Sequence, residues 1–255
     1  MLQYCTLASS SSGNAAFVTD GNTALLIDLG ISTRAAVREL AELGVEPGAI
    51  DAICITHEHG DHIKGLATWR KRFPQTPVYA PAPLCTVLEA TPLPVECAVA
   101  IQSLTVTAFP TPHDTDFSVG YRISAGGVTL TSMTDLGHVP ETLYPYIDGA
   151  DLLLLEANYD PDKLRYGRYP APVKQRIAGL RGHLSNFDCA ACAAAAVARG
   201  TKTVVLGHLS CENNTPRLAY ETVHRTLVGA GVIPGVDMML GVAPPTGRSE
   251  LYVLK

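Results

Sequence analysis

Residues 56–62, Thr-His-Glu-His-Gly-Asp-His, bring three histidines and one aspartate into a single turn of the chain. The apolar run before them, residues 50–55, predicts a buried strand, and residues 63–70 predict the start of a helix. Imidazole and carboxylate groups crowded at the end of a strand either compete for solvation or share a cation. This stretch therefore constrains the fold strongly, because few positions in a protein tolerate such a cluster.

The spacing within this stretch divides its side chains into two sets. His57 and His59 alternate by two, so both point the same way as the strand ends. Asp61 and His62 fall inside the turn and the start of the helix, and they face a second point nearby. Nitrogen and oxygen ligands of this kind suit Zn²⁺ or Mn²⁺, so the spacing predicts two adjacent metal positions. The alternative is a solvated loop rich in acid and histidine.

The H-x-H-x-D-H pattern resembles the metallo-β-lactamase superfamily, in which further ligands follow other strands. Four polar residues stand after apolar runs that predict strands, namely Asp28, His113, Asp135 and His208. Any one of them alone would more often be an ordinary loop residue or the start of a helix. Four of them at the carboxyl ends of predicted strands indicate a shared site.

The resemblance implies two divalent metal ions per chain, Zn²⁺ or Mn²⁺, and a division of the ligands between them. The implied ligands are His57, His59 and His113 for one ion, Asp61, His62 and His208 for the other, and a bridging Asp135. Asp28 would orient one of these ligands through a hydrogen bond. Two such ions activate a bridging hydroxide as the nucleophile, with Asp61 among the catalytic residues, so the implied reaction is a hydrolysis.

Two later stretches resemble the paired glutamate and histidine loops of tRNase Z-type phosphodiesterases. They are Leu-Glu-Ala-Asn-Tyr-Asp at residues 155–160 and Gly-His-Leu-Ser-Asn at residues 182–186. By this resemblance, His183 is the general acid that protonates the leaving oxygen, and Glu156 orients it. The alternative is that Glu156 merely ends a strand and that His183 merely precedes a helix cap.

The numbers of residues between the predicted ligands separate this chain from two kinds of enzyme in the superfamily. Only 21 residues separate His113 from Asp135, too few for the tRNA-gripping arm of tRNase Z. Only 72 separate Asp135 from His208, too few for the inserted domain of RNase J-type enzymes.

Five short motifs indicate which family of the superfamily the chain resembles. They are Ser-Ser-Gly-Asn near the start, Thr-Asp-Leu-Gly at 134–137, Glu-Ala-Asn-Tyr-Asp at 156–160, Gly-His-Leu-Ser-Asn at 182–186 and His-Leu-Ser-x-x-Asn-Asn at 208–214. Together they resemble the YycJ/WalJ family over nearly the whole chain. That resemblance implies a 5′-to-3′ exonuclease that acts on double-stranded DNA, with a link to DNA repair.

Positive charge is concentrated in one segment of an otherwise acidic chain. The net charge of −5 argues weakly against nucleic acid, but residues 163–181 hold six basic residues and no acidic one. Two tyrosines and two prolines interleave with these charges. We expect a basic loop that contacts the phosphate backbone of DNA through Arg165, Arg168, Lys174 and Arg176. The alternative is a solvated surface loop.

The order of predicted strands and helices agrees with the α/β fold that the resemblance implies. This fold is an αββα sandwich, two packed mixed β-sheets with helices outside, and we expect residues 1–255 to form it as a single domain. Both halves of the chain hold strands and then helices, with no linker and no low-complexity tract. Among the local elements, we expect a helix up to Phe73, a break at residues 91–94 and a helix at residues 139–146.

Composition places the protein among globular cytoplasmic proteins. Apolar residues make up 47% of the chain and charged residues 17%, which is typical of a globular domain. We expect no signal peptide, and no apolar run approaches the roughly 20 residues that span a bilayer. The seven scattered cysteines predict reduced thiols.

Two other functions remain open from the sequence. The first is a small-molecule metallohydrolase, a glyoxalase II-like thioesterase or a lactonase, which would need a closed apolar pocket near the metals. The second is a regulatory or binding protein that keeps metals only for structure. The sequence makes no prediction of the oligomeric state.

Overall fold

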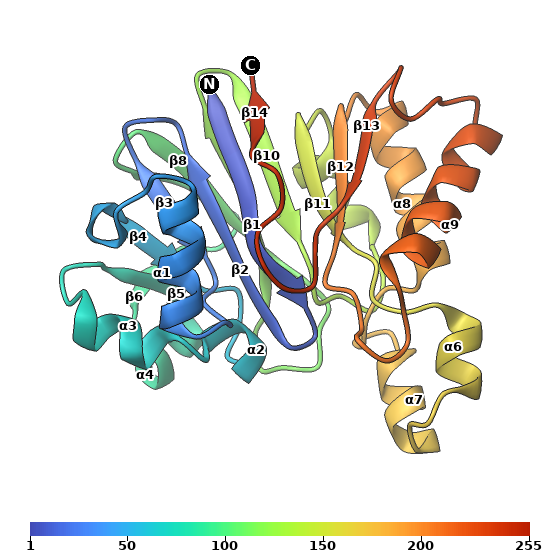
Figure 1. The fold of residues 1–255 in the computed structure, drawn as a ribbon, viewed down its shortest axis with the longest axis horizontal. Helices are drawn as coiled ribbons and strands as arrows, with labels where there is room; N and C mark the ends of the chain where they lie inside the picture. Colours follow the sequence, from blue (N-terminus) through green and yellow to red (C-terminus); the bar gives the residue numbers. More distant parts are fainter.

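The computed structural model describes residues 1–255 as two seven-stranded sheets packed face to face (Figure 1). The strands of the first sheet are, in spatial order, β14 (Tyr252–Leu254), β1 (Leu2–Ser10), β2 (Gly13–Thr19), β3 (Ala24–Ile27), β4 (Ala52–Cys54), β5 (Val78–Pro81) and β6 (Thr91–Leu93). Those of the second are β13 (Met239–Val242), β12 (Thr203–Gly207), β11 (Leu152–Glu156), β10 (Val128–Met133), β9 (Val119–Ala125), β8 (Leu104–Pro110) and β7 (Ala98–Ile101).

Helices cover the outer faces of both sheets. On the first sheet lie α1 (Thr33–Glu42), α3 (Leu66–Arg72) and α4 (Cys85–Leu88), and on the second α8 (Asn186–Ala198) and α9 (Pro216–Gly229). The shorter helices are α2 (Gly60–Ile63), α5 (Tyr144–Ile147), α6 (Pro161–Tyr166), α7 (Ala171–Ile177), and the 3-10 turns η1 (Pro47–Ala49), η2 (Ala82–Leu84) and η3 (Glu141–Leu143). This layering is the αββα sandwich, so the predicted fold class is confirmed.

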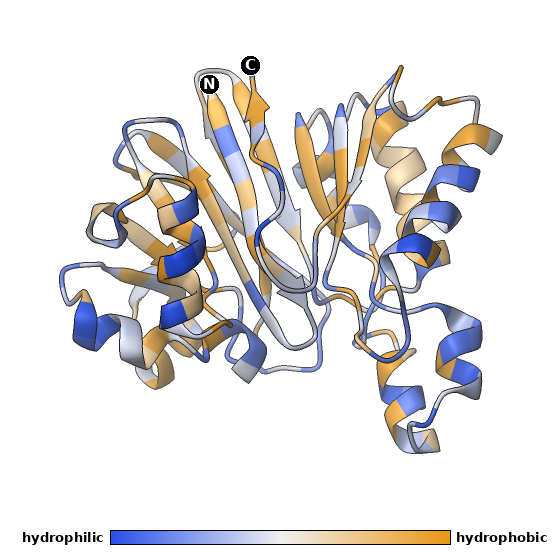
Figure 2. Ribbon diagram, in the orientation of Figure 1, coloured by the Kyte–Doolittle hydropathy of each residue, from blue (hydrophilic) through white to orange (hydrophobic).

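Burial of apolar side chains explains the layers. A cluster of 23 buried residues fills the space between the sheets, and one further cluster lies under the helices of each outer face. β11 is buried along its whole length, as its four consecutive leucines predict for a strand covered on both faces. Figure 2 shows apolar colour along the strands and polar colour on α1 and α9. None of the helices combines the length and the apolar character that a membrane-spanning segment needs.

Parallel strands bring the polar residues that follow them to one rim of the sandwich. In the first sheet β3 and β4 pair in parallel, and in the second β10, β11 and β12 do so. β8 joins this set because both β8 and β10 are antiparallel to β9. The carboxyl ends of all these strands therefore lie at the same edge, where α2, α6 and α7 are also found (Figure 1).

Three residues just beyond these strand ends have left-handed backbone conformations. The φ angles are 60° at Asp28, 58° at Asp135 and 51° at His208. Side chains other than glycine adopt this region rarely, although Asp and His do so more often than most. Such strain persists only where the surrounding structure holds it, and it is concentrated at functional sites.

The prediction of a basic loop at residues 163–181 was wrong, because much of this segment is helical. The Asp160 side chain caps the first turn of α6 by accepting from the Lys163 N–H at 2.9 Å, and Pro161 occupies the first turn. Proline again stands in the first turn of α7. The prolines that suggested a loop are thus helix starts.

Other local predictions needed correction as well. Residues 91–93, expected to be a break, form β6, where Pro92 is tolerated because β6 is an edge strand. The helix expected up to Phe73 is divided into α2 and α3. The helix expected at residues 139–146 begins later, as the turn η3 followed by α5.

Candidate metal centre

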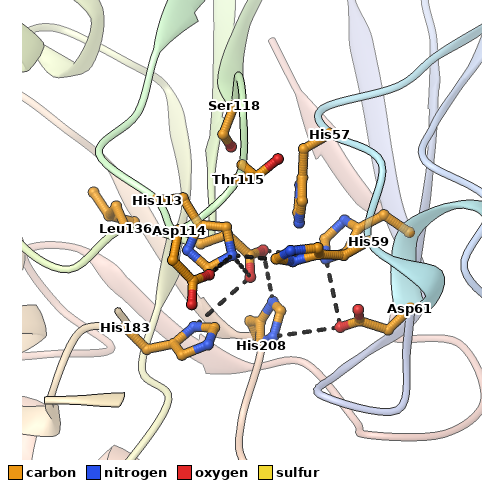
Figure 3. Close-up of polar contacts among 12 residues, drawn as sticks. His57, His59, Asp61, His113, Asp114, Thr115, Ser118, Leu136, His183 and His208 are labelled. Carbon is orange, nitrogen blue, oxygen red and sulfur yellow. Dashed lines mark hydrogen bonds and ion pairs between the residues drawn. The ribbon is translucent and has the colours of Figure 1, made fainter. Parts of the chain in front are cut away.

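Seven predicted ligand side chains meet at the rim formed by the strand ends (Figure 3). From the first sheet come residues after β4 and in α2, namely His57, His59, Asp61 and His62. From the second sheet come residues after β8, β10 and β12, namely His113, Asp135 and His208. The site therefore lies across the two sheets.

The first group of donors is His57, His59 and His113, whose ligand atoms all lie within 4.8 Å of one another. His113 donates its Nδ1–H to the Gly182 carbonyl at 3.1 Å, which leaves its Nε2 facing the group. The Nε2 of His57 is buried and has no hydrogen-bond partner. Buried polar atoms without partners are rare, so His57 Nε2 fits a group that binds a cation, and His113 Nε2 lies 3.3 Å from His59 Nδ1 within the same group.

The second group is Asp61, His62 and His208, again with ligand atoms within 4.8 Å. His62 is fully buried and donates its Nδ1–H to Asp28 at 2.8 Å, so its Nε2 faces the other donors and lies 3.2 Å from Asp135 Oδ2. The turn that carries Asp61 packs on Gly30, where an added Cβ would stand 1.6 Å from the Asp61 carbonyl oxygen. Only glycine permits this approach.

Asp135 stands between the two groups. Its Oδ2 lies 2.9 Å from His208 Nδ1 and 3.2 Å from His62 Nε2, and its Oδ1 lies 3.7 Å from His113 Nε2. In spite of the short distances, neither Oδ2 nor His208 Nδ1 makes a contact with hydrogen-bond geometry. This is the arrangement expected of donors that face a common cation and not each other.

The protonation states also suit divalent cations. Burial lowers the pKa of His57 and of His113, so both imidazoles are neutral and offer lone pairs. Burial opposes ionisation of Asp135, but the imidazoles of His208 and His62 hold its pKa well below the usual range. Burial likewise lowers the pKa of His62, but the Asp135 and Asp28 carboxylates raise it well above the ordinary value in the cation-free chain. A cation bound here would displace that proton, because a ligating imidazole is neutral.

Asp28 fixes the orientation of the second group. Its carboxylate accepts from the Thr56 N–H at 2.8 Å, from the Thr56 hydroxyl at 2.9 Å and from His62. The Thr56 hydroxyl also lies 3.0 Å from His57 Nδ1. One buried carboxylate thus supports a ligand of each group, directly for His62 and through Thr56 for His57.

Glu156 and His183 form a pair beside the donors. His183 donates its Nδ1–H to Glu156 Oε1 at 2.7 Å, and Glu156 Oε2 accepts from the N–H groups of Leu136 and Leu184 at 3.0 and 3.2 Å. Burial lowers the pKa of His183, but the fully buried Glu156 carboxylate raises it to about 9 in the cation-free chain. His183 Nδ1 lies 3.7 Å from Asp135, so the pair adjoins both donor groups.

The loop before His183 is held by contacts that the sequence did not predict. The Arg181 guanidinium donates to the carbonyls of His113 and Thr115, both at 2.7 Å. The His183 N–H donates to the Ile177 carbonyl at 2.9 Å, and a Cβ on Gly182 would stand 2.2 Å from that same oxygen. The end of α7 and the imidazole of His183 are therefore positioned together. Arg181 was recognised only as one more positive charge.

The four basic side chains predicted to contact nucleic acid differ in their surroundings. Lys174 donates through Nζ to the carbonyls of Arg165 and Gly167 at 2.8 and 2.7 Å, so it caps the end of α6. Arg176 forms a salt bridge with Asp114. Arg165 and Arg168 are exposed and form no salt bridge. Of the four, only these two have charges that no carboxylate or carbonyl of the protein engages, although the Arg165 guanidinium lies 5.4 Å from the centroid of the Tyr166 ring.

Asn14 and Asp114 also adjoin the cluster, and neither was singled out from the sequence. Asn14 Nδ2 donates to the Ser10 carbonyl at 2.9 Å and lies 3.1 Å from His62 Nε2. The Ser-Ser-Gly-Asn motif predicted a polar hairpin turn but not its position, because such a turn reaches the site only if the fold places it there. Asp114 directly follows His113, and nothing in the sequence distinguishes it from an ordinary loop acid.

Fold and donor set together define a metallo-β-lactamase-type protein with a site for divalent metals. A family model described as the beta-lactamase superfamily domain matches residues 23–209. Within this superfamily the chain belongs to the YycJ/WalJ family. It is 33% identical to exodeoxyribonuclease WalJ of Streptococcus pneumoniae (strain D39), an alignment that covers 98% of this chain and 97% of the relative. It is also 33% identical to exodeoxyribonuclease YycJ of Bacillus anthracis, with 90% of each chain covered.

Solved structures share the fold at lower sequence identity. The metallo-β-lactamase fold protein YhfI from Bacillus subtilis superposes with a TM-score of 0.75 at 16% identity and covers 97% of this chain and 98% of its own. Zn²⁺-bound PqqB from Methylobacterium extorquens superposes with a TM-score of 0.69 at 20% identity and covers 97% of this chain and 99% of its own. At these identities the likeness establishes the αββα architecture.

Proposed function

We propose that this protein is a nuclease that uses two divalent cations, Zn²⁺ or Mn²⁺, to hydrolyse phosphodiester bonds at the ends of double-stranded DNA, proceeding from 5′ to 3′. The relatives that it matches over nearly their whole length carry the name exodeoxyribonuclease. The two donor groups joined by Asp135 support the number of cations.

The observation that carries the proposal is the Glu156–His183 pair beside the donor groups. Hydrolysis of a phosphodiester leaves an alkoxide on a sugar, which needs a proton as the bond breaks. His183 holds a proton at neutral pH because Glu156 accepts its Nδ1–H at 2.7 Å, and its Nε2 is then available to deliver a proton to the leaving oxygen. We therefore assign His183 as the general acid and Glu156 as its orienting partner.

The remaining residues bind and orient. When bound, two cations would lower the pKa of a water molecule between them and stabilise negative charge on the phosphate. His57, His59 and His113 would bind one cation, Asp61, His62 and His208 the other, and Asp135 both. Asp28 accepts from His62 Nδ1–H and so directs His62 Nε2 toward the second group.

Surface charge near the rim fits a polyanion better than a small apolar substrate. An open hollow of about 470 Å³ lies between α6 and the loop after His208, lined by Lys163, Tyr166, Gly167, Arg168, Glu212 and Asn213. Only one of its lining residues is hydrophobic. We assign Arg165 and Arg168 as the principal phosphate contacts, and Lys174 and Arg176 as lesser ones because protein groups already engage them.

The test uses purified protein reconstituted separately with Mn²⁺ and Zn²⁺. Each form meets 5′-phosphorylated linear duplex DNA, single-stranded DNA and RNA, with Asp61→Ala and His183→Ala as variants and His224→Ala, a histidine on the outer helix α9, as the matched control. We expect metal-dependent shortening of duplex DNA from its 5′ ends, abolished by Asp61→Ala and slowed by His183→Ala.

A fully metallated protein that cuts no nucleic acid would refute the proposal. Thioesters and lactones would then be the substrates to test. Binding supplies a second measure, because the combined variant Arg165→Ala/Arg168→Ala should reduce the salt dependence of DNA affinity by about two phosphate contacts. An unchanged salt slope would exclude these residues from the interface.

Two further assignments accompany the proposal. We infer that residues 1–255 act as a single domain, because the donor groups draw residues from both sheets. We also place the protein in the cytoplasm, since all seven cysteines are unpaired, as thiols are in a reducing compartment.

A further inference from the structure

Asp114 is a carboxylate at the donor cluster that the arrangement described above does not use. Its Oδ1 lies 3.3 Å from Nε2 of His113, the nitrogen that faces the first donor group. This oxygen is buried and has no hydrogen-bond partner. Figure 3 shows Asp114 between His113 and His183, on the side of the site where the proton donor lies.

The other oxygen of Asp114 is engaged by Arg176. Arg176 Nε donates to Asp114 Oδ2, although 61% of the arginine side chain is exposed. Arg176 belongs to α7, a helix with no buried residue. The ion pair therefore joins a helix on the surface to a carboxylate that adjoins the predicted ligands.

The charge of the two donor groups is unequal. The second group contains the carboxylate of Asp61, whereas the first consists of three histidines and shares only Asp135. Two divalent cations bring four positive charges to a site whose ligands supply two negative ones. A third carboxylate next to His113 would reduce the excess positive charge at the first donor group, which has no carboxylate of its own.

Distance allows Asp114 to act on the same cation as His113. Asp114 Oδ1 lies 3.3 Å from His113 Nε2 but does not belong to the mutually close donor atoms of His57, His59 and His113, so its effect on that cation would be electrostatic. We propose that Asp114 compensates the charge of the cation bound by His57, His59 and His113, and that Arg176 competes with this cation for the Asp114 carboxylate. The inference rests on the two-cation site of the proposed function.

Competition makes opposite predictions for the two partners. Removing the Asp114 charge withdraws attraction from the cation, whereas removing Arg176 frees the whole carboxylate for it. A purely structural ion pair would instead weaken the site in the same direction whichever partner is lost. The sign of the Arg176 effect is therefore the discriminating observation.

The experiment is a Zn²⁺ titration of the metal-free protein against a chromophoric chelator, without nucleic acid. We expect Asp114→Asn to raise the Kd of one of the two cations about tenfold. Arg176→Ala should lower that Kd several-fold, and the double variant should match Asp114→Asn alone. Arg217→Ala is the matched control, because Arg217 forms a surface salt bridge with Glu221 on α9 and should leave both Kd values unchanged.

Either of two results would overturn the inference: a Kd that neither substitution changes, or a Kd that Arg176→Ala raises. Arg176 is mostly exposed, so this variant is expected to fold, and a melting curve checks that it does. A chain that binds two cations with these shifts but cuts no DNA would refute only the proposed function.

Discussion

Asp28→Asn tests whether the support beneath the donors decides cation affinity. The carboxylate accepts from the Thr56 N–H at 2.8 Å, from the Thr56 hydroxyl at 2.9 Å and from His62 Nδ1 at 2.8 Å. An amide has one acceptor oxygen, so it cannot satisfy both sides. If its NH₂ faces His62, the imidazole proton moves to Nε2, the atom needed by the cation. If the NH₂ faces Thr56, the asparagine amide N–H meets the backbone N–H of Thr56, and neither can accept a hydrogen bond.

The expected loss follows from these contacts. Outer partners of ligating histidines are typically worth about 10–100-fold in metal affinity, or about 1.4–2.7 kcal/mol. The backbone should contribute nothing, because asparagine tolerates the φ of 60° at this position as readily as aspartate. We therefore expect the Kd of one Zn²⁺ to rise by this factor in a chelator competition assay.

The matched control is Asp51→Asn. Asp51 directly precedes β4 of the same sheet and accepts from the Ala24 N–H at 2.8 Å, but it touches no predicted ligand. It should leave the Zn²⁺ affinity unchanged. A folded Asp28→Asn protein with the affinity of the wild type would refute the claim that Asp28 orients His62.

Three further predictions concern catalysis, stability and the metals. Glu156→Gln should lower kcat on duplex DNA by roughly 10²-fold, because the general acid loses its orienting charge, with little change in DNA affinity; an unaltered kcat would count against the dyad. Burial disfavours the charged form of Asp151, but hydrogen bonds from Lys202 and Thr129 lower its pKa, so its contribution to stability is present above the unfolded pKa and is lost as the pH falls through the folded one. Asp151→Asn should therefore cost about 1 kcal/mol in urea unfolding at pH 7 and nothing below both pKa values, and an equal loss at both pH values would contradict this account. Removing the metals with a chelator should lower Tm yet leave the circular dichroism of the fold intact, because the donors are held by buried contacts; complete unfolding would show that the cations organise the chain.

Strand ends were the part of the fold that could be predicted from the sequence. Apolar runs of four to seven residues followed by Asp28, His113 or His208 predict both the strand and the position of a polar residue at its end. Burial confirms the pattern for the runs before Asp28 and His208, since β3 is buried in three of its four residues and β12 along its whole length, whereas β8, before His113, alternates between buried and exposed positions. The αββα class followed from this order together with the resemblance.

Contacts between distant segments could not be predicted in the same way. Nothing in the local sequence says that Arg181 will reach the carbonyl of His113, or that Arg176 will be neutralised by Asp114. The helices α6 and α7 were missed for a local reason, because proline in a basic, tyrosine-containing segment reads equally as a loop or as a first helical turn. Capping by Asp160 decides between them.

The position of the donors across both sheets has a mechanical consequence. A cation on the first group would join His57 and His59 of one sheet to His113 of the other, and a cation on the second would join Asp61 and His62 to His208. Each ion is then a cross-link between the two halves of the sandwich, comparable in effect to a disulfide between layers. Under tension that separates the sheets, the metallated protein should resist to a higher force than the metal-free one, because the sandwich cannot open without breaking metal–ligand bonds.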